Sequence, residues 1–295
     1  MSQIETTSVE SGDLTLNERF RIFGILGLIL ASFVFFALWP PRWLQSIEMW
    51  VNTRAVWSNL PIWYYILITL VDVHITTACV SLFLHRCQTH GSITFNRFVG
   101  YAMEFWLWIF TAMATIRWVA VHRKHHAKVE TDEDPHSPVM YGVWRVFFYG
   151  TKLYHHAAYD EFVLRKYGKG IARRWFYLKF SLLGPVIAFV LNLWLFGIVG
   201  FPMWLVEMVW IPGFAAGVIN GLGHWWGYRN FDTPDNSRNL PSKILAILTC
   251  GESSHNNHHY NQNSPKFSVK KGEIDLGWYY SRALEFVGLA HNRNT

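Results

Sequence analysis

The sequence predicts an all-α integral membrane protein with about four transmembrane helices and a helical cap on the cytosolic side. Only 16% of its 295 residues are charged, whereas 51% are hydrophobic and 17% are aromatic. Soluble domains average about 25% charged residues, so this deficit indicates a bilayer protein. Long apolar stretches alternate with polar segments, and most Lys and Arg residues lie in those polar segments. The same composition excludes disordered, collagen-like and disulfide-scaffold classes.

Four apolar stretches are predicted to span the membrane. A span needs ~20 mainly apolar residues to cross ~30 Å of hydrocarbon. The first stretch is the shortest and ends before two prolines, whereas the third and fourth each contain a proline. The predicted spans are residues 23–38, 62–84, 176–201 and 203–222.

A fifth apolar stretch, residues 98–118, contains Glu104 and Arg117 among many aromatic residues. We expect a helix there that lies in the membrane interface or is buried against other helices. Residues 1–20 are polar, unlike a signal peptide, and are expected to form a tail. The whole chain, 1–295, is predicted to be a single membrane domain.

The positions of the basic residues predict the orientation. Residues 85–175 contain 13 of the 26 Lys and Arg residues, and residues 225–295 contain eight. Because positively charged segments stay in the cytosol, four spans place both termini and both of these segments inside. The net charge of +6 is attributed to lipid headgroups or acidic substrates, and no nucleic-acid partner is expected.

Eight of the 14 histidines fall in three short clusters. In the second and third clusters the spacing i, i+3, i+4 places three imidazoles on one face of a helix. In the first cluster, His85 and His90 lie ~140° apart on a regular helix, so they converge only if the helix loosens before Gly91. Asn220 and His224, at the end of the fourth span, share one face, and the topology brings all four elements to the cytoplasmic boundary.

Nine imidazoles are too many for one metal ion, so the cap is predicted to hold a di-metal site. Imidazole suits iron, zinc, copper and nickel, and ligand type alone does not choose among them. A cavity next to lipid would hold an acyl chain, and attack on its C–H bonds needs a metal that activates dioxygen. Zinc has no redox chemistry, so this context favours iron.

The three clusters, His-Arg-x-x-x-His, His-Arg-x-His-His and His-x-x-His-His, resemble in this order the membrane fatty acyl desaturases, in particular the delta-9 acyl-CoA desaturase group. The resemblance runs from about residue 80 to residue 290. Shorter matches support it: Asp134-Pro135-His136, Asn220-x-x-x-His224 followed by Gly227-Tyr228-Arg229, and Gly251-Glu252.

The resemblance implies an oxidoreductase that inserts a cis double bond, at carbons 9 and 10, into a saturated acyl chain while dioxygen is reduced to two waters. It also implies two iron ions bound by nine histidines, with Asn220 acting through a water. The implied ligands are His85, His90, His122, His125, His126, His224, His255, His258 and His259.

An acyl-CoA or a phospholipid acyl chain is the expected substrate, with an external electron donor of the ferredoxin, rubredoxin or cytochrome type. Ser137-Pro138-Val139 replaces the basic and aromatic run of animal members, so carrier and donor stay open. A bacterial cytoplasmic membrane is the expected location. The alternatives are a hydroxylase or terminal-alkene-forming enzyme of the same superfamily and, more remotely, a histidine-rich metal transporter.

Further residues have two interpretations each. Trp118, one turn before His122, either shapes the acyl tunnel or packs at the interface. Arg123 and Lys124 either contact an anionic headgroup or anchor at lipid phosphates. Polar residues inside spans are costly, so Asp72, His74 and Glu207 are either functional or engaged in interhelical hydrogen bonds. His136 is expected to orient its neighbours, and His155 and His156 to form a surface or interface pair.

Overall fold

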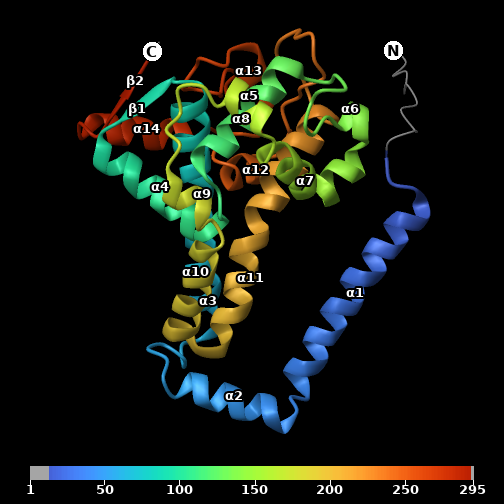
Figure 1. Cartoon of the computed structure of the whole chain (residues 1–295), viewed down its shortest axis with the longest axis vertical. Helices are drawn as coiled ribbons and strands as arrows, with labels where there is room; N and C mark the ends of the chain where they lie inside the picture. The colour runs from blue at the N-terminus through green and yellow to red at the C-terminus, as the bar shows by residue number, and fades with distance from the viewer. Residues whose placement is uncertain (1–12, 294–295) are drawn as a thin grey trace.

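The computed structural model describes residues 13–293. Long helices lie below a cap of shorter helices and loops (Figure 1). The sheet of this part of the chain has two strands: β1 (Ile93–Phe95) pairs antiparallel with β2 (Ala290–Asn292). This pairing fastens the C-terminal end beside the first histidine cluster. The all-α membrane fold predicted from the sequence is confirmed.

Three helical segments are long and apolar enough to cross a membrane, and a bent pair of helices can be counted as a fourth. The first is α1 (Leu16–Leu38), and the second joins α3 (Ile62–Cys79) to the π-helix η1 (Val80–Thr89). The third, Leu183–His224, consists of α10 (Leu183–Phe196), η2 (Gly197–Val199), α11 (Gly200–Ile211), η3 (Pro212–Gly221) and η4 (Leu222–His224).

This third segment contains both the third and the fourth predicted spans. The chain reverses at Gly197, whose φ of 66° is readily adopted only by glycine, and α10 and α11 then lie side by side (Figure 1). Helix α10 begins at Leu183 rather than at residue 176, with Pro185 in its first turn, where a missing N–H is tolerated. The preceding residues form a separate short helix, α9 (Trp175–Lys179).

The predicted helix at residues 98–118 is interrupted. It divides into α4 (Arg97–Thr111) and α5 (Thr115–Lys128), which meet at an angle of 86° because Ala112 adopts a left-handed backbone with φ of 59°. Helix α4 buries Glu104 and Trp108 and exposes Phe98, as expected for a helix packed on one side. The bend turns α5 away from α4, and α5 carries three of the predicted ligands.

Helix α1 stands apart from the other long helices, and α2 (Arg42–Asn52) connects its lower end to them (Figure 1). Thr15 and Glu18 form a capping box that starts the helix. At the cap, the Phe23 ring packs edge-on against Phe148. At the opposite end α1 leads into α2, where the Asn52 side chain accepts a hydrogen bond from the Ile198 N–H.

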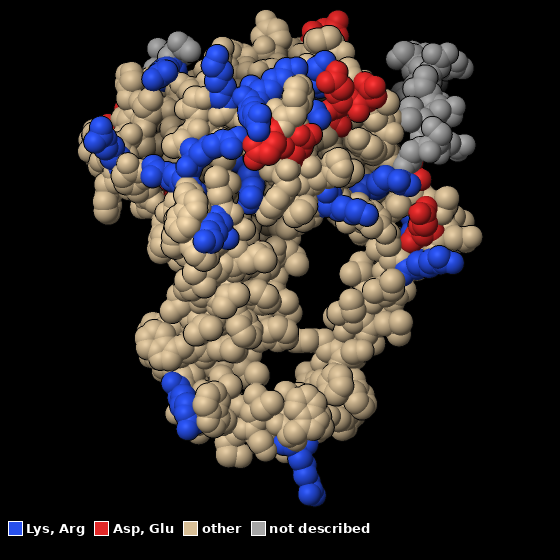
Figure 2. All heavy atoms as spheres, in the orientation of Figure 1, with Lys and Arg blue, Asp and Glu red and all other residues tan. Residues whose placement is uncertain are grey.

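On the face shown in Figure 2 the cap carries most of the charged residues, whereas the middle part of the long helices is almost uncharged. At the end opposite the cap, Arg42 and Arg54 are exposed. The remaining cap helices are α6 (Pro138–Tyr141), α7 (Val143–Ala158), α8 (Glu161–Tyr167), α12 (Lys243–Leu248), α13 (His255–Tyr260) and α14 (Leu276–Phe286).

Of Asp72, His74 and Glu207, the last two make hydrogen bonds between elements. His74 Nε2 lies 2.8 Å from the Tyr280 hydroxyl of α14, and Glu207 on α11 accepts a bond of 3.0 Å from Asn192 on α10. These contacts agree with the interpretation that the polar residues join neighbouring helices.

Candidate metal centre

The first histidine cluster lies on the π-helix η1. The His90 N–H donates to the His85 carbonyl five residues earlier, with an N–O distance of 3.2 Å. A bond of this i→i+5 type widens the helical turn, so that residues five apart come onto one face. The loosening that the sequence required for His85 and His90 to converge is therefore present. Gly91 follows with φ of 63°.

The nine histidines form two buried or half-buried groups, and the ring nitrogens within each lie within 4.8 Å of one another. The five-histidine group consists of His85, His90, His122, His126 and His258. The four-histidine group consists of His125, His224, His255 and His259.

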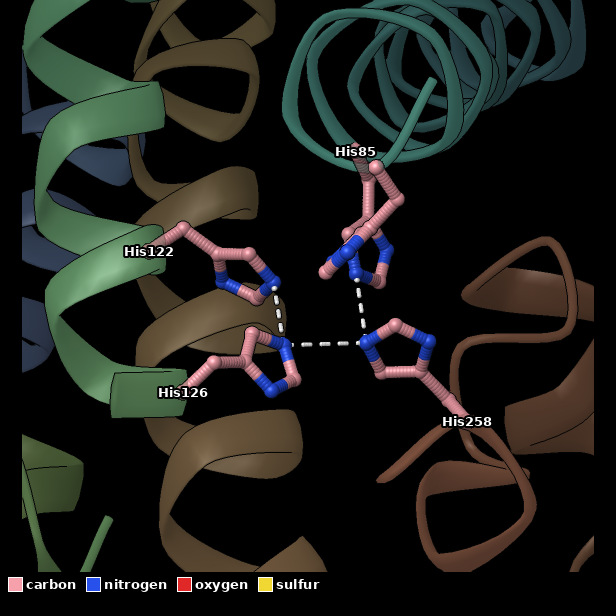
Figure 3. A group of neighbouring side chains, drawn as sticks. His85, His122, His126 and His258 are labelled. Atoms are coloured by element: carbon pink, nitrogen blue, oxygen red, sulfur yellow. Dashed lines mark hydrogen bonds between the residues drawn. The ribbon is translucent and has the colours of Figure 1, made fainter. Parts of the chain in front are cut away.

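Helices α5 and α13 each contribute to both groups. The i, i+4 pair His122 and His126 belongs to the five-histidine group, while His125 points into the other. On α13 the pair His255 and His259 belongs to the four-histidine group, while His258 turns to the five-histidine group. Figure 3 shows the rings of α5, η1 and α13 that converge in the five-histidine group.

The spacing of the ring nitrogens fits a metal ion in each group. The Nε2 atom of His258 lies 2.9 Å from that of His85 and 3.0 Å from that of His126, and the His224 and His255 Nε2 atoms lie 2.9 Å apart. Two nitrogens that each lie ~2.1 Å from an ion and bind it at right angles are ~3.0 Å apart. The buried Nε2 atoms of His90, His125 and His259 have no hydrogen-bond partner within the described part of the chain.

Carboxylates bind the opposite ring nitrogens of four of these histidines. The Nδ1–carboxylate oxygen distances are 2.6 Å for His85–Glu252, 3.0 Å for His125–Asp134, 3.2 Å for His224–Glu130 and 2.8 Å for His259–Asp235. Histidines that bind metals almost always donate their second N–H in this way, which fixes the ring orientation.

Burial favours the neutral form of the histidines on α13. It lowers the pKa of His255, His258 and His259 well below the usual value, and the neighbouring imidazoles lower it further. Neutral imidazoles keep a free lone pair near pH 7. The three histidines of α13 therefore offer neutral nitrogen ligands to a cation.

A small cavity of about 70 Å³ adjoins both groups, and Asn220 lines it together with His85, His122 and His255. Asn220 therefore lines a cavity shared with histidines of both groups, and its water-mediated role, which the resemblance implies, stays a prediction. The Trp118 ring also lines the cavity and stacks on His122, with ring centroids 4.8 Å apart.

The guanidinium of Arg123 binds backbone carbonyls. Its nitrogens donate to the backbone carbonyls of Gln88 and Lys169 at 2.9 Å each, and to those of Thr89 and Tyr167 at longer distances. This arrangement ties the end of η1 to the segment after α8. These contacts favour a structural role for Arg123, and its headgroup role stays a prediction. Lys124 lies half-buried beside it on α5.

We predict that Arg123→Met lowers the free energy of unfolding by about 1.5–3 kcal/mol, the usual worth of hydrogen bonds from a charged group. Substrate KM should stay unchanged. Thermal unfolding in detergent and steady-state kinetics check both. Lys124→Met is the matched control, because the Lys124 ammonium binds no carbonyl in the described residues. A raised KM with unchanged stability would show that Arg123 contacts the substrate headgroup.

The sequence analysis paired none of these carboxylates with a histidine: Asp134 and Glu252 appeared in it only within shorter matches to the family, and Glu130 and Asp235 lie in loops without periodicity. His136 packs its ring on His125, with centroids 4.6 Å apart, which agrees with an orienting role. His155 and His156 are exposed near the end of α7, as expected for a surface pair.

The fold and the site together define a helical membrane protein with a histidine-rich candidate metal centre. The family model described as fatty acid desaturase matches residues 55–271. The chain therefore belongs to the fatty acid desaturase family, whose members are oxidoreductases that act on lipid acyl chains. The matched region contains every histidine of the two groups.

Curated relatives from plants agree with this assignment. The chain is 30% identical to the delta-9 acyl-lipid desaturase 1 of Arabidopsis thaliana, over 77% of this chain and 74% of that protein. It is 29% identical to the delta-9 acyl-lipid desaturase 2 of the same plant, over 85% and 84%. It is 28% identical to the icosanoyl-CoA 5-desaturase of Limnanthes douglasii, over 93% and 79%.

Proposed function

We propose that this protein is an oxygen-dependent fatty acyl desaturase that inserts a cis double bond between carbons 9 and 10 of a saturated acyl chain, at two histidine-bound iron ions. The observation that carries the proposal is the division of nine histidines into two groups with metal-ligand spacing, in a chain of the desaturase family. Attack on an unactivated C–H bond needs a redox-active metal, which selects iron over zinc.

In this proposal the five-histidine group holds one iron ion and the four-histidine group the other, with Asn220 acting through a water. When bound, the two ions would supply the activation of dioxygen that the reaction requires. The chain itself positions the acyl chain and excludes water. Trp118, Ile219 and Val80 give the cavity an apolar wall next to the histidines, and the carboxylates keep the imidazole rings oriented.

We further propose that both termini and the cap face the cytosol, because the cap carries most of the Lys and Arg residues. An external one-electron donor would then reach the site from the cytosolic side. The relatives' names include both acyl-lipid and acyl-CoA substrates, so both carriers belong in the first assay.

The test is product analysis with the purified protein. We expect the iron-loaded enzyme, supplied with a reductant and dioxygen, to convert a saturated C18 chain into a cis-9 monoene, detected by gas chromatography with mass spectrometry. Stearoyl-CoA and a distearoyl phospholipid should be offered in parallel to identify the carrier. An alcohol or a terminal alkene would contradict the proposal in favour of another activity of the superfamily.

A further inference from the structure

The carboxylates behind the metal-binding histidines are divided unequally between the two groups. In the four-histidine group, three of four ligands have one: His125 with Asp134, His224 with Glu130 and His259 with Asp235. In the five-histidine group of the described chain, His85 alone has one, Glu252. The Nδ1 atoms of His126 and His258 are buried without a hydrogen-bond partner.

These carboxylates are largely shielded from water. Asp134 is fully buried, Asp235 and Glu252 are 7% and 8% exposed, and the Glu130 side chain is 13% exposed. Water screens such groups poorly, so their electrostatic effect at short range is larger than that of surface charges. Three carboxylates more than balance a divalent ion in the four-histidine group, whereas one leaves an ion in the five-histidine group positive.

A carboxylate that accepts the ring N–H also makes the imidazole a stronger donor toward the metal. Both effects favour the higher oxidation state of the ion that the imidazole binds. They act mainly on the four-histidine group, because three of its four rings are affected. In the five-histidine group they act on only one of the five rings, that of His85.

We propose that Asp134, Glu130 and Asp235 act as positioning residues that make the two iron sites electronically unequal. The iron of the four-histidine group is then oxidised from ferrous to ferric, by loss of one electron, at a lower potential than the iron of the five-histidine group. This inference rests on the proposed di-iron function. It predicts a state in which the four-histidine site is ferric while the other is still ferrous.

The test is a potentiometric titration of the purified full chain loaded with ⁵⁷Fe, with the ferrous and ferric fractions counted by Mössbauer spectroscopy. We expect two separate one-electron steps. Asp235→Asn should raise the lower step by at least the equivalent of a tenfold change in the equilibrium constant, about 59 mV, and leave the upper step in place. Glu252→Gln should raise the upper step and leave the lower one.

These two variants are matched, because each replaces one carboxylate by an amide that still accepts the ring N–H. Ring geometry is kept and only the charge is lost. Asp134→Asn repeats the test at a second position, in case the Asp235 loop does not tolerate the amide. Glu133→Gln is the control: this exposed side chain binds Lys128 and should move neither step.

The possible outcomes separate the two proposals. If the wild-type chain binds no iron, the proposed function itself fails. If two ions load but are oxidised at one potential, or if Asp235→Asn and Asp134→Asn move the upper step, the asymmetry is wrong while the di-iron function stands. In His258→Ala, the single remaining ion should be oxidised at the lower potential.

Discussion

His258→Ala is expected to abolish desaturation and to remove one of the two iron ions. His258 Nε2 lies within 3.0 Å of two other ring nitrogens of the five-histidine group, so its loss removes the ligand at the middle of that group. Loss of the hydrogen-bond partner of a metal-binding histidine typically lowers metal affinity or activity ~10–100-fold. Loss of the histidine itself should lower activity by more than ~100-fold. Iron content by mass spectrometry should fall from two ions per chain toward one.

His125→Ala is the complementary variant and should remove the ion of the four-histidine group instead. His155→Ala is the control, because His155 is exposed on α7, where its ring stacks on Tyr159. It should leave iron content and activity unchanged. Full iron loading and activity in His258→Ala would refute the ligand assignment.

Asp275→Ala is expected to give the largest loss of stability. Arg86, the second residue of the first cluster, has a completely buried side chain that donates to Asp275 Oδ1 at 2.8 Å. Asp275 also accepts the N–H groups of Phe267 and Trp278. Removing one partner of a buried ion pair leaves an uncompensated charge, which typically costs about 3–5 kcal/mol. Thermal or chemical unfolding in detergent measures the loss.

This pair also supports the site. The Phe267 ring contacts both the Arg86 guanidinium, 3.9 Å from its centroid, and the His258 ring, 4.7 Å away. We therefore expect Asp275→Ala to weaken iron binding as well as folding. Arg282→Met breaks the Arg282–Glu285 pair, in which Arg282 is half-exposed, and should cost less than about 1 kcal/mol. Equal losses of unfolding free energy in the two variants would show that burial of the Arg86–Asp275 pair does not increase its contribution to stability.

The spacing of the histidines predicted their convergence but not their division. On one helix the spacing i, i+3, i+4 places three imidazoles on a common face, and the sequence analysis assigned no ligand to a particular ion. In the structure, α5 and α13 face each other, so that the outer rings of each triplet meet one group and the middle ring meets the other. The relative placement of the two helices determines which ring joins which group, and a local sequence pattern carries no information on that placement.

The apolar stretches and the basic segments by themselves determined that the chain is a helical membrane protein, because burial in lipid depends on composition over ~20 residues. The histidine spacing determined where a metal could bind, because helical periodicity is local. Only the tertiary structure decided which carboxylates lie behind the rings and where the Arg123 guanidinium binds. Glu130 and His224 are 94 positions apart in the chain, and Arg123 and Lys169 are 46 apart. Such contacts form only when distant elements pack, so a sequence read by local patterns does not contain them.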